Sequence, residues 1–154
     1  MRRFLKNWLP VLVWVGVIFL GSTDLMSAQH TSRFIIPFLL WLKPGISAET
    51  LASIHFILRK CAHVAEYAVL GLLLLRTATL MRNFQRSIPI RYLSVLGVCL
   101  LVAATDEFHQ TFVASRGPSV RDIMIDCGGA ILGLLIGSIF RKSSIRLEKA
   151  PADS

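Results

Sequence analysis

"DEFHQTFVASRGPSVRDIMID", residues 106–126, carries four acids, two arginines and a histidine between two apolar runs. A helix needs about 20 mostly apolar residues to cross a bilayer core of ~30 Å. The flanking runs, about residues 91–110 and 120–140, are long enough to be two such spans. The short charged link therefore places the ends of two antiparallel membrane helices side by side.

Two further apolar runs, residues 4–21 and 61–80, raise the number of predicted spans to four. Of the 154 residues, 54% are hydrophobic and only 17% are charged, which favours a polytopic membrane protein over a soluble domain. We expect an all-α membrane helix bundle in one domain over residues 4–142, followed by a disordered cytoplasmic tail over residues 143–154. The first run is expected to be an uncleaved anchor, because its apolar core is unbroken.

The connection between the first two spans has three parts. "GSTDLMSAQHTS", residues 21–32, is expected to be a polar loop. "RFIIPFLLWLKPG", residues 33–45, is too short to cross, so we expect an interfacial or re-entrant segment. "SAETLASIHFILRK", residues 47–60, offers Ser47 and Thr50 as helix N-caps and is expected to lead into the second span as an amphipathic helix.

The basic residues predict the orientation. The N-terminus, the middle connection and the tail hold eleven of the 17 Lys and Arg residues but only two of the nine acids. By the positive-inside rule these regions are cytoplasmic, which gives a multi-pass protein of the plasma (inner) membrane with both termini inside. The net charge of +8 then reflects topology and anionic lipid, and no nucleic-acid partner is expected.

Polar residues recur three or four positions apart in three of the spans, so the members of each set share one helix face. These residues are Lys60, His63, Glu66 and Tyr67 in the second span, Asp106, His109 and Gln110 in the third, and Ser119, Asp122 and Asp126 in the fourth. At ~1.5 Å per residue, all three faces reach the outer third of the membrane. A lone charge at mid-membrane costs about 3 kcal/mol or more. We therefore expect the faces to meet in one chamber that opens outward.

The residue types of this chamber suggest acid–base chemistry and anion binding. The candidate catalytic residues are His63, Glu66, Asp106, His109, Asp122 and Asp126. The candidate ligand-binding residues are Ser22, Ser27, Lys60, Tyr67, Glu107, Gln110, Arg116, Ser119 and Arg121. Glu66 and Asp106 would orient the histidines. The cations Lys60, Arg116 and Arg121 would hold an anionic group or pair with the acids. Tyr67 could instead be a packing aromatic, and Glu107 a solvated boundary acid.

Three stretches resemble the VanZ-like family of small bacterial membrane proteins: "GSTDLMS" (21–27), "RKCAHVAEYAVLGLLL" (59–74) and "ATDEFHQTFVASRGPSVRDIMIDCGGAILGLLIG" (104–137). They cover nearly the whole transmembrane part. One departure is Ala114-Ser115-Arg116, where many relatives have Pro-Gly-Arg. The resemblance implies a cell-envelope protein linked to resistance to the glycopeptide teicoplanin. It implies no particular reaction.

Several functions fit these residues. The protein could be an enzyme acting on a lipid-linked or phosphate-bearing cell-wall precursor or lipid head group. It could be a non-catalytic protein that binds such a head group or a glycopeptide, and only turnover separates the two. Transport is disfavoured by the small number of spans. Alternatively, the charges form a salt-bridge network that only locks the helices. Intramembrane charge is costly to keep, which favours a functional site.

The same residues also allow a metal site or a homodimer as alternatives. The histidines and acids offer N and O ligands for zinc, manganese or magnesium, but the nearby cations would repel a metal ion, and we assign neither a metal nor another cofactor. The three cysteines, Cys61, Cys99 and Cys127, are expected to be packing residues. Gly129, Gly133 and Gly137 share one helix face, which predicts close packing within the monomer or a homodimer seam.

Overall fold

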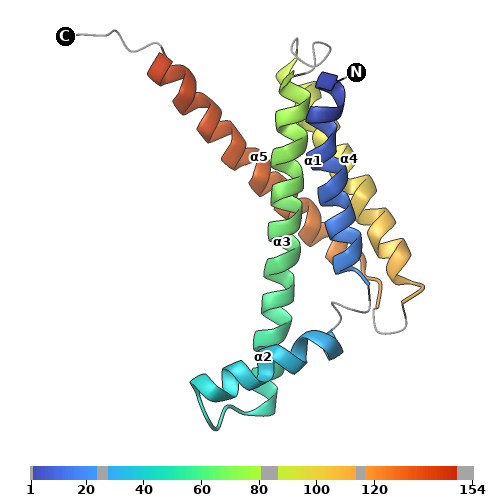
Figure 1. Ribbon diagram of the computed structural model, residues 1–154, viewed down its shortest axis with the longest axis vertical. Helices are drawn as coiled ribbons and strands as arrows, with labels where there is room; N and C mark the ends of the chain where they lie inside the picture. Colours follow the sequence, from blue (N-terminus) through green and yellow to red (C-terminus); the bar gives the residue numbers. More distant parts are fainter. Residues whose placement is uncertain (1, 24–27, 81–86, 114–116, 149–154) are drawn as a thin grey trace, which may run out of the picture.

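The computed structural model describes residues 2–23, 28–80, 87–113 and 117–148, and within these ranges the regular structure is helical (Figure 1). The helices are α1 (Arg2–Gly21), α2 (Ala28–Leu42), α3 (Ala48–Leu80), α4 (Ile88–Gln110) and α5 (Val120–Glu148). All but α2 are long and apolar enough to cross a membrane. The prediction of an all-α membrane helix bundle with four spans is confirmed.

Helix α3 is the centre of the bundle and packs against each of the other four helices. Its 33 residues make it roughly 50 Å long at ~1.5 Å per residue, well beyond the ~30 Å of a bilayer core. The beginning of α3 therefore extends past the ends of α1 and α4, and α2 lies across it (Figure 1). We call this the α2 end of the bundle. The opposite end, where α1 begins and α5 ends, is the terminal end.

Glycines allow α5 to lie directly against α3. A Cβ added at Gly129 would lie 2.5 Å from the carbonyl oxygen of Val64, and one added at Gly133 would collide with the carbonyl oxygen of Ala68. Only glycine permits this approach of two helix backbones. The expected packing of the Gly129, Gly133 and Gly137 face within the monomer is thus observed. A homodimer through these glycines would have to displace α3.

The connection between α1 and α3 is more helical than expected. Helix α2 begins at Ala28, so the prediction of a polar loop through residue 32 is wrong for residues 28–32. Thr31 lies on this added turn, and its Oγ1 is 3.0 Å from Nε2 of His55 on α3. This contact between the helices supports a helical turn over a free loop. Residue 45 is a glycine with φ +94°, a conformation suited to glycine, and it lets the chain turn from α2 into α3.

The beginning of α3 is a capped helix. The Thr50 backbone N–H donates to Ser47 Oγ at 3.2 Å, so Ser47 is the N-cap. The expected amphipathic helix and the second span form one continuous helix. The other end of the domain needs a correction, because α5 continues to Glu148 and the expectation of disorder is wrong for residues 143–148. The sequence has no proline or glycine between Gly137 and Pro151 to end the helix earlier.

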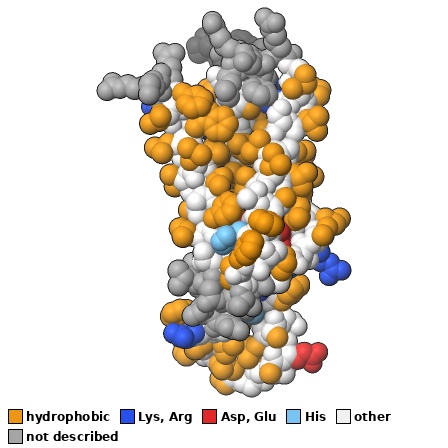
Figure 2. All heavy atoms as spheres, turned by 90° about the vertical axis from the view of Figure 1, so that its right-hand side faces the viewer, with side chains coloured by type: hydrophobic (Ala, Val, Ile, Leu, Met, Phe, Trp, Pro, Cys, Tyr) orange, Lys and Arg blue, Asp and Glu red, His pale blue; other side chains and the backbone are white. Residues whose placement is uncertain are grey.

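The outer surface of the bundle suits contact with lipid. Figure 2 shows hydrophobic side chains over most of the height of one face. On α2, the large apolar residues Phe34, Phe38 and Trp41 are all exposed. A helix lying across the bundle with exposed aromatic residues resembles an interfacial segment more than a re-entrant one.

Candidate functional site

The polar residues predicted from the sequence gather at the level where α1 and α4 end and α5 begins. Two contacts join α3 to α5 there. Lys60 Nζ lies 2.5 Å from Asp122 Oδ1, and His63 Nδ1 lies 3.2 Å from Asp126 Oδ1. The first is one of the expected pairs of a cation with an acid. The second differs from the expectation, because Asp126, and not Glu66, is the carboxylate bonded to His63.

A second group joins α1 to α4. Ser22 Oγ donates a hydrogen bond to Asp106 Oδ1, and Gln110 Nε2 donates to Asp106 Oδ2 at 3.0 Å. The Asp106 side chain is completely buried. Its described partners are therefore uncharged hydroxyl and amide groups, whereas the sequence suggested a cation or His109. Ser22, expected at the rim of the site, is itself buried.

His109 lies away from the other histidine. Its ring packs edge-on against Phe19 of α1, with the ring centroids 5.9 Å apart. The expected pairing of His109 with Asp106 is not among the contacts of the described residues. The reason is geometric: residues three apart on a helix differ in direction by roughly 60°, which turns His109 to α1 while Asp106 faces Ser22.

Glu107 and Ser119 hold the beginning of α5. The Ser119 backbone N–H donates to Glu107 Oε2 at 2.7 Å, and Ser119 Oγ accepts from the Arg121 backbone N–H at 3.2 Å. Glu107 is only 4% exposed, so its reading as a solvated boundary acid is wrong. It satisfies a backbone donor that the helix leaves open at its N-terminus. The Arg121 side chain is exposed, and within the described part of the chain it forms no ion pair with the predicted acids.

Several polar atoms at this level are buried without a hydrogen-bond partner among the described residues. They are Tyr67 Oη, Glu107 Oε1, His109 Nδ1 and Asp126 Oδ2; Trp8 Nε1 is a fifth such atom elsewhere on α1. Buried polar atoms without a partner are uncommon in proteins. Their concentration around the charged residues is unusual for a region that serves packing alone. Tyr67 is also part of the hydrophobic core, so its expected alternative as a packing aromatic is observed.

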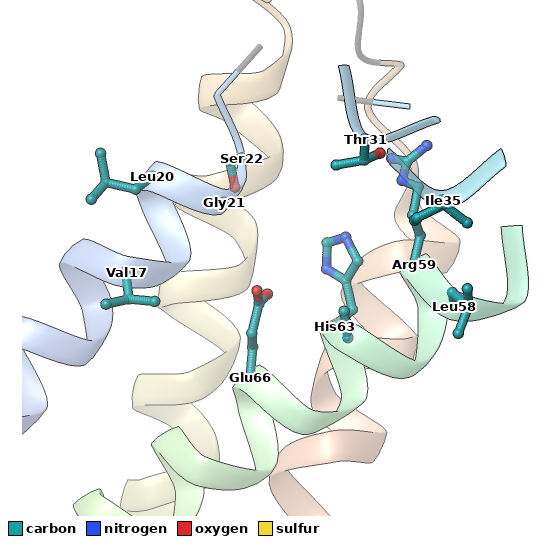
Figure 3. Close-up of a pocket in the computed structure, with 11 residues that line it drawn as sticks. Val17, Leu20, Gly21, Ser22, Thr31, Ile35, Leu58, Arg59, His63 and Glu66 are labelled. Atoms are coloured by element: carbon teal, nitrogen blue, oxygen red, sulfur yellow. The ribbon is translucent and has the colours of Figure 1, made fainter. Parts of the chain in front are cut away.

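A cavity of about 600 Å³ lies between α1, α2 and α3 (Figure 3). We call it the α2-end pocket. Its apolar wall comes mainly from Val17 and Leu20 of α1, Ile35 of α2 and Leu58 of α3. Its polar lining residues are Ser22, Thr31, Arg59, His63 and Glu66. The pocket thus combines a surface for hydrocarbon with groups for a polar or anionic head.

One face of α3 supplies the charged part of the pocket. Arg59, His63 and Glu66 follow one another at four and three positions, and all three line it. In Figure 3, His63 and Glu66 point from α3 into the space between α1 and α2. The base of the pocket is joined to α1, since Trp14 Nε1 donates to the Glu66 carbonyl oxygen at 2.8 Å. The Glu66 carboxylate would lie 3.3 Å from a Cβ at Gly21.

Arg59, Thr31 and Trp14 were missed as site residues by sequence reasoning. A signal for Arg59 was available, because it lies one helical turn before His63 on the face that also carries Glu66. Thr31 was missed because its segment was read as a loop. Nothing local marks Trp14, which meets Glu66 only through the packing of α1 on α3.

The α2-end pocket differs from the chamber predicted from the polar faces. Its lining comes from α1, α2 and α3. Asp106, Asp122 and Asp126 are not part of this lining and form contacts between helices instead. Ser27 and Arg116, two predicted ligand-binding residues, lie outside the described residues. Among the residues that the structure does describe, no three His, Cys, Asp or Glu side chains are placed to hold a metal ion.

Comparisons with known proteins agree with the resemblance in the sequence. The profile of the VanZ/LLP1 family matches residues 7–141, nearly the whole helical part of the chain. No curated protein and no solved structure showed significant similarity to it. The matched region includes both polar groups described above and all four apolar helices, apart from the first residues of α1 and the last residues of α5. This multi-pass membrane protein therefore belongs to the VanZ/LLP1 family.

Proposed function

We propose that the protein binds the phosphate-bearing head group of an anionic membrane lipid in the α2-end pocket. The observation that carries the proposal is the make-up of this pocket, in which an apolar wall and a charged face of α3 line the same 600 Å³ cavity. Pockets for small molecules are mostly apolar with a few polar groups that fix orientation. A lipid has the same two-part chemistry.

Arg59 is the cation best placed to hold the phosphate. A guanidinium group can donate two parallel hydrogen bonds to phosphate oxygens. Lys60, the neighbouring cation, is already engaged by Asp122. Among the described residues Arg59 forms no such ion pair, and the Thr31 hydroxyl lines the pocket beside it. An acyl chain would then lie along Val17 and Leu20.

The proposal includes an orientation. Basic residues concentrate at the terminal end of the bundle, near the beginnings of α1 and α4 and in the last turns of α5. By the positive-inside rule this end is cytoplasmic, so the α2-end pocket faces the outer leaflet of the plasma membrane. There it would meet phospholipids and lipid-linked cell-wall precursors. Binding such molecules would connect the pocket to the glycopeptide resistance with which the family is associated.

Lipid that remains bound during purification tests the proposal. The full-length protein is extracted in mild detergent, and native mass spectrometry measures retained phosphatidylglycerol and, in a second sample, an added polyprenyl diphosphate. We expect stoichiometric retention of at least one of them, and a reduction of about tenfold or more in Arg59→Gln, since a bidentate charged contact contributes about 1.5–3 kcal/mol. The control is Arg76→Gln, an exposed arginine of the same helix.

The two lipids distinguish the possible sources of the phosphate. Preference for phosphatidylglycerol indicates a phospholipid site, and preference for the diphosphate indicates a cell-wall precursor. Equal lipid retention by wild type and Arg59→Gln would contradict the assignment of the pocket. A cysteine placed at Ser47 tests the orientation independently. We expect a membrane-impermeant thiol reagent added to the cell exterior to label it.

A second candidate is a purely structural role for the polar residues. The observation in its favour is that Lys60–Asp122, His63–Asp126 and Ser22–Asp106 each join two different helices. In this case the pairs would lock helix register. The test compares the melting temperature and the lipid retention of Arg59→Gln with those of the wild type. Because Arg59 is outside these pairs, a structural network predicts no change in either.

A further inference from the structure

We propose that the α2-end pocket is hydrolytic: His63, oriented by Asp126, is a general base that cleaves an acyl ester of a glycerophospholipid bound there. This inference rests on the proposed function, because it requires the lipid to be held in the pocket. It gives a catalytic role to the contact between His63 and Asp126, which the binding of a head group does not require. Asp126 comes from α5 and is not a lining residue of the pocket, which it meets through its contact with His63.

The contact between Asp126 and His63 sets the state of the imidazole. As an ionised carboxylate, Asp126 can only accept hydrogen bonds, so His63 Nδ1 must carry the proton in their 3.2 Å contact. The lone pair of the neutral ring is then on Nε2. His63 lines the pocket, and Figure 3 shows its ring pointing into the space between α1 and α2. A carboxylate on one nitrogen and a substrate pocket at the ring are the arrangement of a histidine base in hydrolytic enzymes.

The burial of the pair favours this role over a chance contact. Asp126 is completely buried, and its side chain comes from the helix held against α3 by Gly129. The imidazole is thus positioned by a rigid interface between two helices. The His63 side chain is 12% exposed and lines the pocket, so it can meet a molecule there. A site on rigid elements can hold a base to the accuracy that catalysis requires.

The spacing of Arg59 and His63 along α3 indicates that the bond cleaved is an ester bond. His63 lies four residues, roughly 6 Å, deeper than Arg59 along the helix axis. In a glycerophospholipid the ester carbonyls are separated from the phosphate by the glycerol carbons, a distance of similar size. A phosphate held by Arg59 therefore places an ester beside His63, with the acyl chain continuing along the wall of Val17 and Leu20.

Glu66 opposes the alternative of phosphate hydrolysis at His63. It lies one turn deeper in the same pocket. A phosphate beside His63 would approach this carboxylate, and like charges at short range in a poorly hydrated site repel strongly. An ester carbonyl is uncharged and meets no such repulsion. The electrostatics of the pocket thus favour phosphate at Arg59 and ester at His63.

The proposed step is a simple hydrolysis. A water molecule gives a proton to His63 Nε2 while its oxygen bonds to the ester carbonyl carbon. The bond between this carbon and the glycerol oxygen then breaks, and the glycerol oxygen takes the proton from Nε2. The products are a free fatty acid and a lysophospholipid, and the imidazole returns to its starting state. No redox partner or further reactant is needed.

The test uses full-length protein reconstituted in vesicles of dioleoylphosphatidylglycerol. Mass spectrometry follows oleic acid and lysophosphatidylglycerol, and native mass spectrometry of the same preparation measures bound lipid. We expect turnover by the wild type and a decrease in kcat of at least about 100-fold in His63→Gln and Asp126→Asn. Asparagine keeps the shape of Asp126 but donates a hydrogen bond to Nδ1, which leaves the proton on Nε2.

The readouts separate the possible failures. Asp126 is a positioning residue, so Asp126→Asn should lower kcat while KM and lipid retention stay unchanged; a misfolded variant would lose both. Glu49→Gln, the same change at an exposed acid of α3, should behave as wild type. Bound lipid without oleic acid release would overturn the hydrolysis and leave the binding proposal standing. Absence of bound phosphatidylglycerol would overturn the hydrolysis, and the binding proposal would fall as well if the polyprenyl diphosphate were also not retained. Full turnover by Asp126→Asn would overturn the Asp126–His63 assignment.

Discussion

The two halves of α3 belong to one uninterrupted helix but have different surroundings. Of its nine buried residues, eight lie in the second half, between Tyr67 and Ala78. In the first half, residues 48–66, only His55 is buried. Backbone contact with α5 begins at Val64, near the end of the first half, and continues at Ala68 in the second half. The earlier turns of α3 are held by individual polar contacts such as Thr31–His55 and Lys60–Asp122.

This difference shows how a small bundle can be stable and still enclose a site. Close packing needs small residues and leaves no space for a ligand. The α2-end pocket lies on the first half of α3, where Leu58, Arg59, His63 and Glu66 line it. The first half therefore gains a cavity where the second half has a core. Substitutions in the two halves should differ accordingly in their effects.

The largest effect is expected at the contact of α3 with α5. Gly133→Ala places a Cβ against the carbonyl oxygen of Ala68, so the two helices must separate. We expect a loss of about 3 kcal/mol, at the upper end for overpacking, measured by SDS-induced unfolding in micelles. Gly128→Ala is the matched control, because an added Cβ there meets no atom within 4 Å. Equal stability of the two variants would contradict the close contact.

A smaller effect is expected where the first half of α3 meets α5. Asp122→Asn or Lys60→Met removes one partner of a half-buried pair with an N–O distance of 2.5 Å. We expect each to lower the unfolding free energy by about 1–3 kcal/mol, and the double variant by less than their sum. Unfolding in micelles measures all three. Additive effects would show that the pair is not coupled; Lys43→Met at an exposed lysine is the control.

The smallest effect is expected at the beginning of α3. Ser47→Ala removes the oxygen that accepts from the Thr50 N–H, a loss of about 1 kcal/mol for a typical N-cap. Because few contacts hold this end, the change should appear as faster hydrogen exchange at residues 48–51 with no effect beyond Tyr67. Ser53→Ala, at an exposed position within the helix, should leave exchange unchanged. Faster exchange throughout α3 would show that its halves unfold together.

Sequence reasoning succeeded where information is local. The four spans follow from length and hydropathy, and the helix boundaries agree within a few residues except at Ala28 and Glu148. The polar faces follow from spacing of three and four residues. What failed was the choice of partners: His63 is three positions from Glu66 in the chain, yet its carboxylate is Asp126, 63 positions away. Spacing places a residue on a face but does not say which helix that face meets.

The sequence by itself determined that there are four apolar helices and that three of them carry charged faces at one level of a membrane, because helix periodicity and the cost of intramembrane charge depend only on residue type and position. The tertiary structure alone decided which faces meet. Gly129 and Gly133 let α5 approach α3 closely, and this contact brings Asp126 to one nitrogen of His63. The pocket forms where α1 and α2 both pack on α3 without, among the described residues, packing on each other, and no local sequence pattern records this arrangement.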